Sequence, residues 1–147
     1  MKSEPDAYSI DDLKRDKVHC WDGVRSYQAR NSMRDQMHKG DGIIFYHSSA
    51  ETIGAVGVAK VVSLPYPDHT QFNPKSHYFD AKSKKENPTW IMVDVRFVKK
   101  FSQTVTRDAM KREHSLSGML LWKYNRLSIV ELTLKEFDTI TELGKKK

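Results

Sequence analysis

Apolar positions along this chain fall into runs that predict a small set of strands. The run 43–48 is apolar on both faces, as in a strand at the centre of a sheet, and the run 54–62 is similar but richer in glycine. Glycine weakens an ordinary strand but suits the bends and close approaches of a small barrel. Further strands are expected at 90–97 and 126–130, and the segment before Pro5 is expected to be extended.

The run 90–97 alternates with a period of two. Its core face is expected to carry four apolar residues, Ile91, Val93, Val95 and Phe97. Trp90 falls on the opposite face. It is therefore expected either to cover the barrel beneath a helix or to form the wall of a binding pocket.

Caps and helical spacing predict four short helices. Ser9 stands three residues before Asp12, and Thr133 three before Glu136, and both pairs match a capping box. The expected helices are at 9–15, 27–37, 106–114 and 133–144. The strands and helices are segregated along the chain, which indicates an α+β fold with about five or six strands in a small barrel flanked by short helices.

The stretch 21–31 has more chemistry than a helix start requires. It holds an indole, a phenol, two guanidinium groups and two amides, which together can stack on and hydrogen-bond a planar heterocycle. Asp22 or Gly23 is expected to cap the helix that follows, and Gly40 to stop it in a left-handed conformation. This stretch is the first candidate for a binding site.

The segment 63–88 contains no regular pattern. Prolines and asparagines give it turn chemistry, and a loop of this length in a small domain is usually functional or mobile. Lys82, Lys84 and Lys85 are candidates for contacts with phosphates, although a solvated loop would have the same composition. Four residues have metal-ligand side chains but a spacing that matches no recognised site, so no metal is expected: Asp68, His69, His77 and Asp80.

Length and composition set further limits. The 147 residues suffice for one domain, 1–147, and the single cysteine, Cys20, allows neither an intrachain disulfide nor a cysteine zinc cluster. No apolar run approaches the roughly 20 residues of a membrane helix. We expect an intracellular monomer without a cofactor or a membrane partner, cytoplasmic in a bacterium and nuclear in a eukaryote.

Charge points to an anionic partner. The formal net charge is +6, and residues 73–147 hold 16 Lys and Arg against 9 Asp and Glu. A basic face in this half would meet phosphates, whereas a solvated charged surface would explain the same count.

Several motifs resemble those of one known family. The segments KSEP, WDGVRSYQARN, GD, FYHS, LPYPDHTQF, NPTWIMVDV and RLSIV occur in this order between Lys2 and Val130. They resemble the EVE domain, a member of the PUA-like superfamily related to the YTH readers of N6-methyladenine. Members usually carry an apolar segment such as Trp-Leu before the first motif, so the first strand is expected to be shorter here or the start trimmed.

The resemblance implies a non-catalytic domain that holds a flipped, modified base of DNA or RNA in an aromatic and polar pocket. The expected pocket residues are Lys2, Ser3, Trp21, Arg25, Tyr27, Asn31, His47, Ser48, Trp90 and Ser128. Arg30 is expected to join the three loop lysines in binding phosphates. For four of these residues a structural role is the alternative: Trp21 in the core, Tyr27 in packing, His47 as a hydrogen-bonded strand end, and Trp90 as a cover for the barrel.

Two other classes of function compete with this one. An enzyme, such as a nuclease or a hydrolase of modified nucleotides, needs an activated nucleophile, an acid–base pair or a metal. The sequence offers no nucleophile elbow or glycine-rich phosphate loop, and Asp68–His69 is the remaining candidate pair. A protein-interaction module is compatible with the surface but has no motif in its favour.

Overall fold

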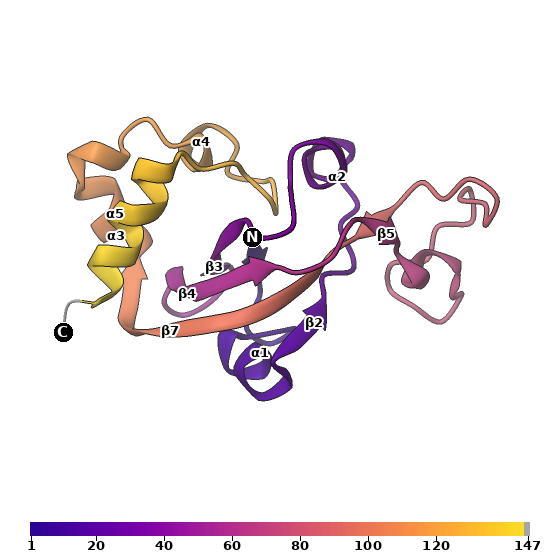
Figure 1. Cartoon of the computed structure of the whole chain (residues 1–147), viewed down its shortest axis with the longest axis horizontal. Helices are drawn as coiled ribbons and strands as arrows, with labels where there is room; N and C mark the ends of the chain where they lie inside the picture. The colour runs from indigo at the N-terminus through magenta and orange to yellow at the C-terminus, as the bar shows by residue number, and fades with distance from the viewer. Residues whose placement is uncertain (146–147) are drawn as a thin grey trace.

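A curled five-stranded sheet forms the centre of the computed structural model, which describes residues 1–145 (Figure 1). Its order is β1-β3-β4-β7-β2, with β1 parallel to β3 and the other pairs antiparallel. A separate two-stranded ladder joins β5 to β6. The strands are β1 Lys2–Ser3, β2 Val18–Cys20, β3 Gly42–His47, β4 Gly54–Val61, β5 Tyr66–Pro67, β6 Ile91–Met92 and β7 Asp94–Thr106.

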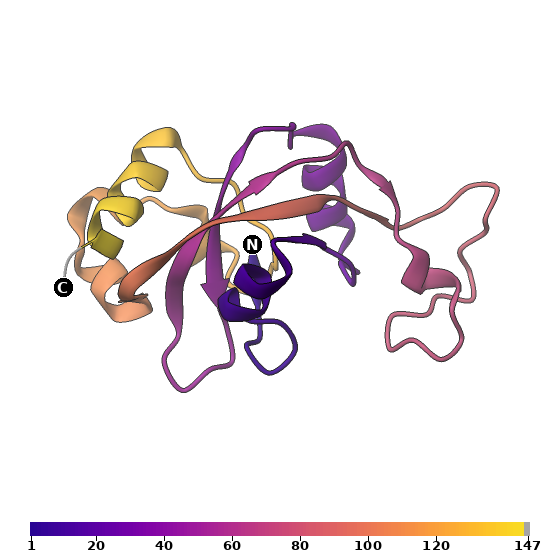
Figure 2. The ribbon, with the colours of Figure 1, turned by 60° about the horizontal axis from the view of Figure 1, so that its bottom comes forward.

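Short helices flank both sides of this sheet, as expected for the α+β barrel class (Figure 2). The helices are α1 Ile10–Asp16, α2 Tyr27–Asp35, α3 Arg107–Arg112, α4 Leu120–Lys123 and α5 Leu134–Lys145, with 3-10 turns η1 His69–Phe72 and η2 His114–Leu116. None of the described helices has the length and apolarity to cross a bilayer.

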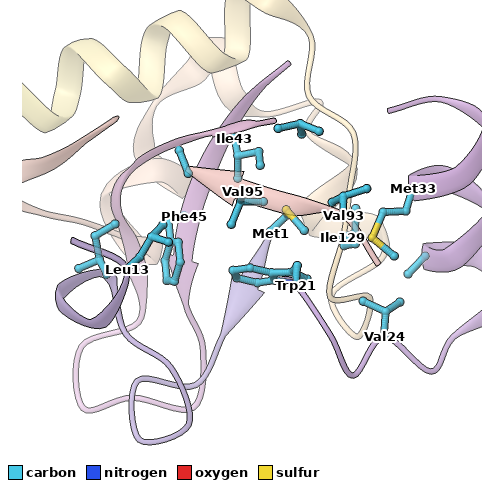
Figure 3. Close-up of a cluster of buried hydrophobic side chains, with 14 of the residues drawn as sticks. Met1, Leu13, Trp21, Val24, Met33, Ile43, Phe45, Val93, Val95 and Ile129 are labelled. Carbon is cyan, nitrogen blue, oxygen red and sulfur yellow. The ribbon is translucent and has the colours of Figure 1, made fainter. Parts of the chain in front are cut away.

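Two buried clusters lie on opposite faces of the sheet. The first includes Phe45 of β3, with Leu13 of α1 beside it, and at its other end Met33 of α2 beside Ile129 (Figure 3). The second packs Ile44 of the same strand beneath Ile140 of α5. Consecutive residues of β3 thus enter different cores, which confirms the prediction that this run is apolar on both faces.

The predicted caps are partly confirmed. Both hydrogen bonds of the capping box of α1 form between Ser9 and Asp12, and the box predicted at the start of α5 also forms. The prediction for α2 was wrong: its cap is Ser26, whose Oγ accepts the Ala29 N–H. Gly23 instead adopts a positive φ of 81° three residues upstream of the cap.

The last predicted strand is also wrong. Residues 126–130 are irregular and meet the sheet edge through one backbone hydrogen bond among the described residues, from Lys2 N–H to Ser128 O at 2.8 Å. Ile129 nevertheless points into the first core, so the apolar pattern reflects burial without pairing.

The predicted strand 90–97 is present in two parts. The chain breaks regular pairing at Val93, between β6 and the long β7. Val93 and Val95 are both buried in the first core, so the predicted core face is confirmed there.

The irregular segment 63–90 is anchored by two buried polar side chains, Asp68 and Gln71, both 0% exposed. The amide nitrogen of Gln71 donates to the carbonyl oxygens of Asp68 (2.6 Å) and Trp90 (2.7 Å). Its amide oxygen accepts the Trp90 N–H and the Ser83 hydroxyl. Gln71 therefore links the two ends of the loop without an unsatisfied polar atom.

Asp68 ties this loop to the 21–25 segment. Its Oδ2 accepts from the Gly23 N–H at 2.8 Å and from Arg25 Nη1 at 3.0 Å, and its Oδ1 accepts from Thr70. Burial alone would raise the pKa of Asp68, but hydrogen bonds from Thr70, Gly23 and Arg25 hold that pKa below its usual range. The carboxylate is thus ionised and fully committed to structure.

Trp90 lies off both core clusters, as its strand phase predicts, but it is buried rather than open to a ligand. Its Nε1–H donates to Asp80 at 2.8 Å, and its ring lies 5.0 Å from that of Tyr27. The guanidinium of Arg25 lies over its ring at 5.4 Å. Of the two expected roles, covering the fold beneath a helix is the one that this environment matches.

Removing the Asp68 carboxylate should destabilise the fold strongly. Asp68→Ala leaves the partly buried Arg25 guanidinium unpaired and is expected to cost about 3 kcal/mol in the free energy of unfolding. The exposed pair Arg34–Asp35 provides the control, because Asp35→Ala should leave the free energy of unfolding almost unchanged. Denaturant unfolding of both variants measures the difference, and equal costs would show that Asp68 is not the anchor.

Truncating Trp90 should affect stability more than binding. We expect Trp90→Ala to lose about 3–5 kcal/mol, the usual cost for a buried aromatic. Tyr27→Ala is the matched control, since Tyr27 is 62% exposed and contributes mainly its contact with Trp90. Equal unfolding midpoints for the two variants would contradict the structural role of Trp90.

Candidate nucleic-acid interface

An open cleft of about 1020 Å³ lies where β1, the 19–24 segment, α3 and the 121–128 segment meet. Residues from both ends of the sequence form its walls, from Lys2 to Ser128. Five of the predicted pocket residues line it: Lys2, Ser3, Trp21, Ser48 and Ser128.

Aromatic rings form much of the cleft wall. Tyr8 and His19 stack face to face with centroids 3.9 Å apart and planes 15° apart. Trp21 has a double role, because it lines the cleft while its ring packs edge-on against Phe45 in the core. The core position expected as the alternative for Trp21 is therefore compatible with a place in the wall.

Tyr78 adds a ring from the 63–90 loop. It rests on Gly23, where a Cβ atom would lie only 2.6 Å from the nearest ring carbon. Glycine at this position thus permits both the positive φ and the close approach of the ring. The contact explains why a residue expected to be a helix cap serves the cleft instead.

Polar groups at the base of the cleft are held by short contacts. The Ser3 hydroxyl donates to the Tyr8 carbonyl oxygen at 2.7 Å, and the Ser48 N–H donates to the Ser3 carbonyl oxygen at 3.0 Å. The Lys2 ammonium donates to the Asn125 carbonyl oxygen at 2.7 Å, and burial lowers its pKa. These bonds fix β1 against two other segments and place its side chains at the cleft.

Asp22 is the half-buried carboxylate of the cleft. Its side chain makes no hydrogen bond or ion pair with any other described residue, unlike its neighbour Asp68. Burial, and then the nearby Asp68 carboxylate, raise the pKa of Asp22.

Three cations stand on the cleft that the sequence reasoning missed: Arg107, Lys111 and Arg126. Lys111 lies over the Trp122 ring at 5.5 Å, whereas Arg107 and Arg126 make no side-chain hydrogen bond or ion pair within residues 1–145. The basic excess of residues 73–147 pointed to this half, and Arg126 opens the RLSIV motif, but neither signal identified these three cations as cleft residues.

The other five predicted pocket residues do not line the cleft: Arg25, Tyr27, Asn31, His47 and Trp90. His47 is the hydrogen-bonded strand end expected as its alternative, because its Nε2 accepts the Ile10 N–H at 3.1 Å. Burial lowers the pKa of His47. Asn31 accepts from Arg30 on the exposed side of α2.

Arg25 and Tyr27 belong to a cation–aromatic stack that runs from the cleft to α2. Arg25 lies between the rings of Tyr78 (5.5 Å) and Trp90 (5.4 Å), and Arg30 lies over the ring of Tyr27 at 4.9 Å. Arg25 therefore packs against the Tyr78 ring, which lines the cleft, so this stack helps to position a cleft residue although its other members do not line the cleft.

The predicted phosphate ligands lie away from the cleft. Lys82, Lys84 and Lys85 are exposed on the 63–90 loop, which extends from one end of the molecule (Figure 2). Arg30 donates to the Thr89 carbonyl oxygen at 2.9 Å and so helps to hold that loop.

The geometry offers little for catalysis. Asp68, half of the candidate pair Asp68–His69, is fully buried and saturated with donors, so it cannot take a proton from a substrate. Within residues 1–145 no group of three His, Cys, Asp or Glu is placed to hold a metal ion. What the cleft provides is stacking surface, hydrogen-bonding groups and positive charge.

Known proteins share this fold closely. Human thymocyte nuclear protein 1 is 40% identical over all of this chain and 73% of its own length. The structure of a hypothetical protein from Leishmania major superposes with a TM-score of 0.95 at 42% identity, covering 99% of this chain and 92% of that one. The human THYN1 protein, solved in complex with DNA containing 5-methylcytosine, has a TM-score of 0.94 at 40% identity over 100% of this chain and 96% of its own.

The family comparison agrees with the motifs and the fold. The family model described as the EVE domain matches residues 1–143, nearly the whole chain. The chain therefore belongs to the EVE domain family.

Proposed function

We propose that this protein binds nucleic acid, specifically DNA with a modified base such as 5-methylcytosine, and holds that base, flipped from the stack, in the cleft without altering it. The observation that carries the proposal is the composition of the cleft, which joins aromatic walls, polar groups and a cationic rim in one concavity. The complex of the human relative with 5-methylcytosine DNA supports the choice of ligand.

The size and lining of the cleft suit an extruded nucleotide. At about 1020 Å³ it lies at the upper end of the usual range for ligand pockets, about 300–1,000 Å³. Stacking on an aromatic ring contributes about 1–3 kcal/mol per base, which is enough to hold a flipped base but not a whole strand. Extrusion itself costs a few kcal/mol, so further contacts with the backbone are needed.

The cations of the rim supply those contacts in this proposal. Within residues 1–145 the side chains of Arg107 and Arg126 make no hydrogen bond or ion pair, and both are exposed at the cleft, where a flipped nucleotide would enter. Phosphate neutralisation releases counterions and provides affinity that does not depend on sequence. The loop lysines, Lys82, Lys84 and Lys85, would contact phosphates further along the same strand.

An enzyme acting on modified nucleotides is the other candidate. It has no support from the cleft, whose half-buried carboxylate, Asp22, lacks an acid–base partner within hydrogen-bond distance among the described residues. We therefore propose a reader, nuclear in a eukaryote and cytoplasmic in a bacterium, that acts as a monomer.

Removing the rim cations should flatten the salt dependence of DNA binding. Each neutralised phosphate contributes roughly 0.7–0.9 to the magnitude of the slope of log affinity against log salt. If Arg107 and Arg126 each neutralise one phosphate, the double variant Arg107→Ala/Arg126→Ala should reduce that magnitude by about 1.4–1.8. The triple variant Lys82→Ala/Lys84→Ala/Lys85→Ala is the comparison and should change the slope less. A slope altered by the loop variant alone would move the backbone path away from the cleft.

Prolonged incubation should leave the DNA unchanged. We expect no cleavage and no base conversion in 5-methylcytosine DNA after incubation with the protein and Mg²⁺ or Zn²⁺, as measured by gel and by mass of the released nucleosides. Turnover that disappears in the Asp22→Asn variant would replace the reader by an enzyme.

A further inference from the structure

Asp22 is an unusual residue for a cleft that is otherwise rich in donors. Its neighbours Trp21 and Gly23 are fixed by packing and by the Gly23–Asp68 hydrogen bond, so the carboxylate is held at a defined place in the wall. It has no hydrogen-bond or ion-pair partner among residues 1–145. Glu4 is the other carboxylate of the lining, and it is exposed.

Leaving this carboxylate unpaired does not help the fold. Partial burial and the neighbouring Asp68 both disfavour its ionised form, which is why its pKa is raised. For an acid, a raised folded-state pKa means that stability is lost as the pH rises above the unfolded pKa. A group that costs stability and lines a cleft is a candidate for function.

We propose that Asp22 selects the base, by accepting a hydrogen bond from the exocyclic amino group of cytosine or 5-methylcytosine. The proposal rests on the function proposed above and adds the group that discriminates. Carboxylates accept from cytosine N4 in protein–DNA recognition generally. Among the residues that line the cleft, Asp22 is the half-buried carboxylate, whereas the Ser3 hydroxyl donates its proton to the Tyr8 carbonyl oxygen and the Lys2 ammonium can only donate.

Thymine is the base that this arrangement should reject. It has the same C5 methyl group as 5-methylcytosine, so both fill an apolar methyl site equally. At position 4, however, thymine carries a carbonyl oxygen, which would face the Asp22 carboxylate with no proton between two acceptors. Buried acceptors left facing each other discriminate strongly against the wrong ligand.

The test compares three duplexes that differ at one position, which holds 5-methylcytosine, cytosine or thymine opposite an abasic site. With no partner base, each test base starts equally unpaired. We expect the wild-type protein to prefer 5-methylcytosine over thymine by about tenfold or more, in line with the discrimination of about 1–3 kcal/mol for a good base contact. In Asp22→Asn the preference should shrink to about threefold or less, because the amide nitrogen can donate to the thymine oxygen.

Asp6→Asn is the matched control, since it makes the same change at an exposed carboxylate that does not line the cleft and should keep the wild-type preference. The unfolding midpoint of Asp22→Asn should not fall, which separates a binding role from a structural one. A 5-methylcytosine to thymine ratio that stays at the wild-type value in Asp22→Asn overturns the assignment, whether or not overall affinity changes. If the wild-type protein binds none of the three duplexes, the proposed function itself fails.

Discussion

The buried Asp68 carboxylate is the interaction on which the arrangement of the cleft depends. It receives the Gly23 N–H and the Arg25 guanidinium, and so joins a loop and a turn that are more than 40 residues apart in sequence. Because the turn carries Trp21 and Asp22 while the loop carries Tyr78, one ion pair sets the position of three cleft residues. A partly buried ion pair of this kind stabilises the fold only while both partners are present, so loss of either partner should disturb the arrangement of the cleft.

The regular elements were the predictable part of this fold. The two-faced pattern of residues 43–48 and the capping box at Ser9 depend on local chemistry and on burial, and both are confirmed. The segment 126–130 has an equally apolar pattern but does not form a strand. Its Ile129 is buried in the first core, and burial of a side chain does not require its backbone to pair with a strand. Hydrophobic pattern therefore predicted where the chain is buried better than how its backbone is bonded.

The cleft was less predictable, because proximity in it arises from tertiary contacts. Ser3 and Ser48 were found through family motifs, whereas Arg107 lies outside these motifs, and Arg126 opens the RLSIV motif but was not predicted as a site residue. His47 and Trp90 have side chains suited to recognition, but in the fold His47 accepts the Ile10 N–H and Trp90 donates to Asp80. Sequence spacing does not reveal either partner. The sequence predicted Asp22 or Gly23 as the cap of α2, but the cap is Ser26 and Gly23 adopts a left-handed conformation.

The cleft walls come from both ends of the chain, with Lys2 and Ser3 meeting the 121–128 segment. During synthesis Lys2 and Ser3 leave the ribosome first, and more than a hundred further residues follow before the 121–128 segment that forms the opposite wall. Such long-range closure comes late in folding, because its loop entropy is repaid only when the distant segment arrives. The strands of the sheet, which end at Thr106, are therefore synthesised before the 121–128 wall of the cleft.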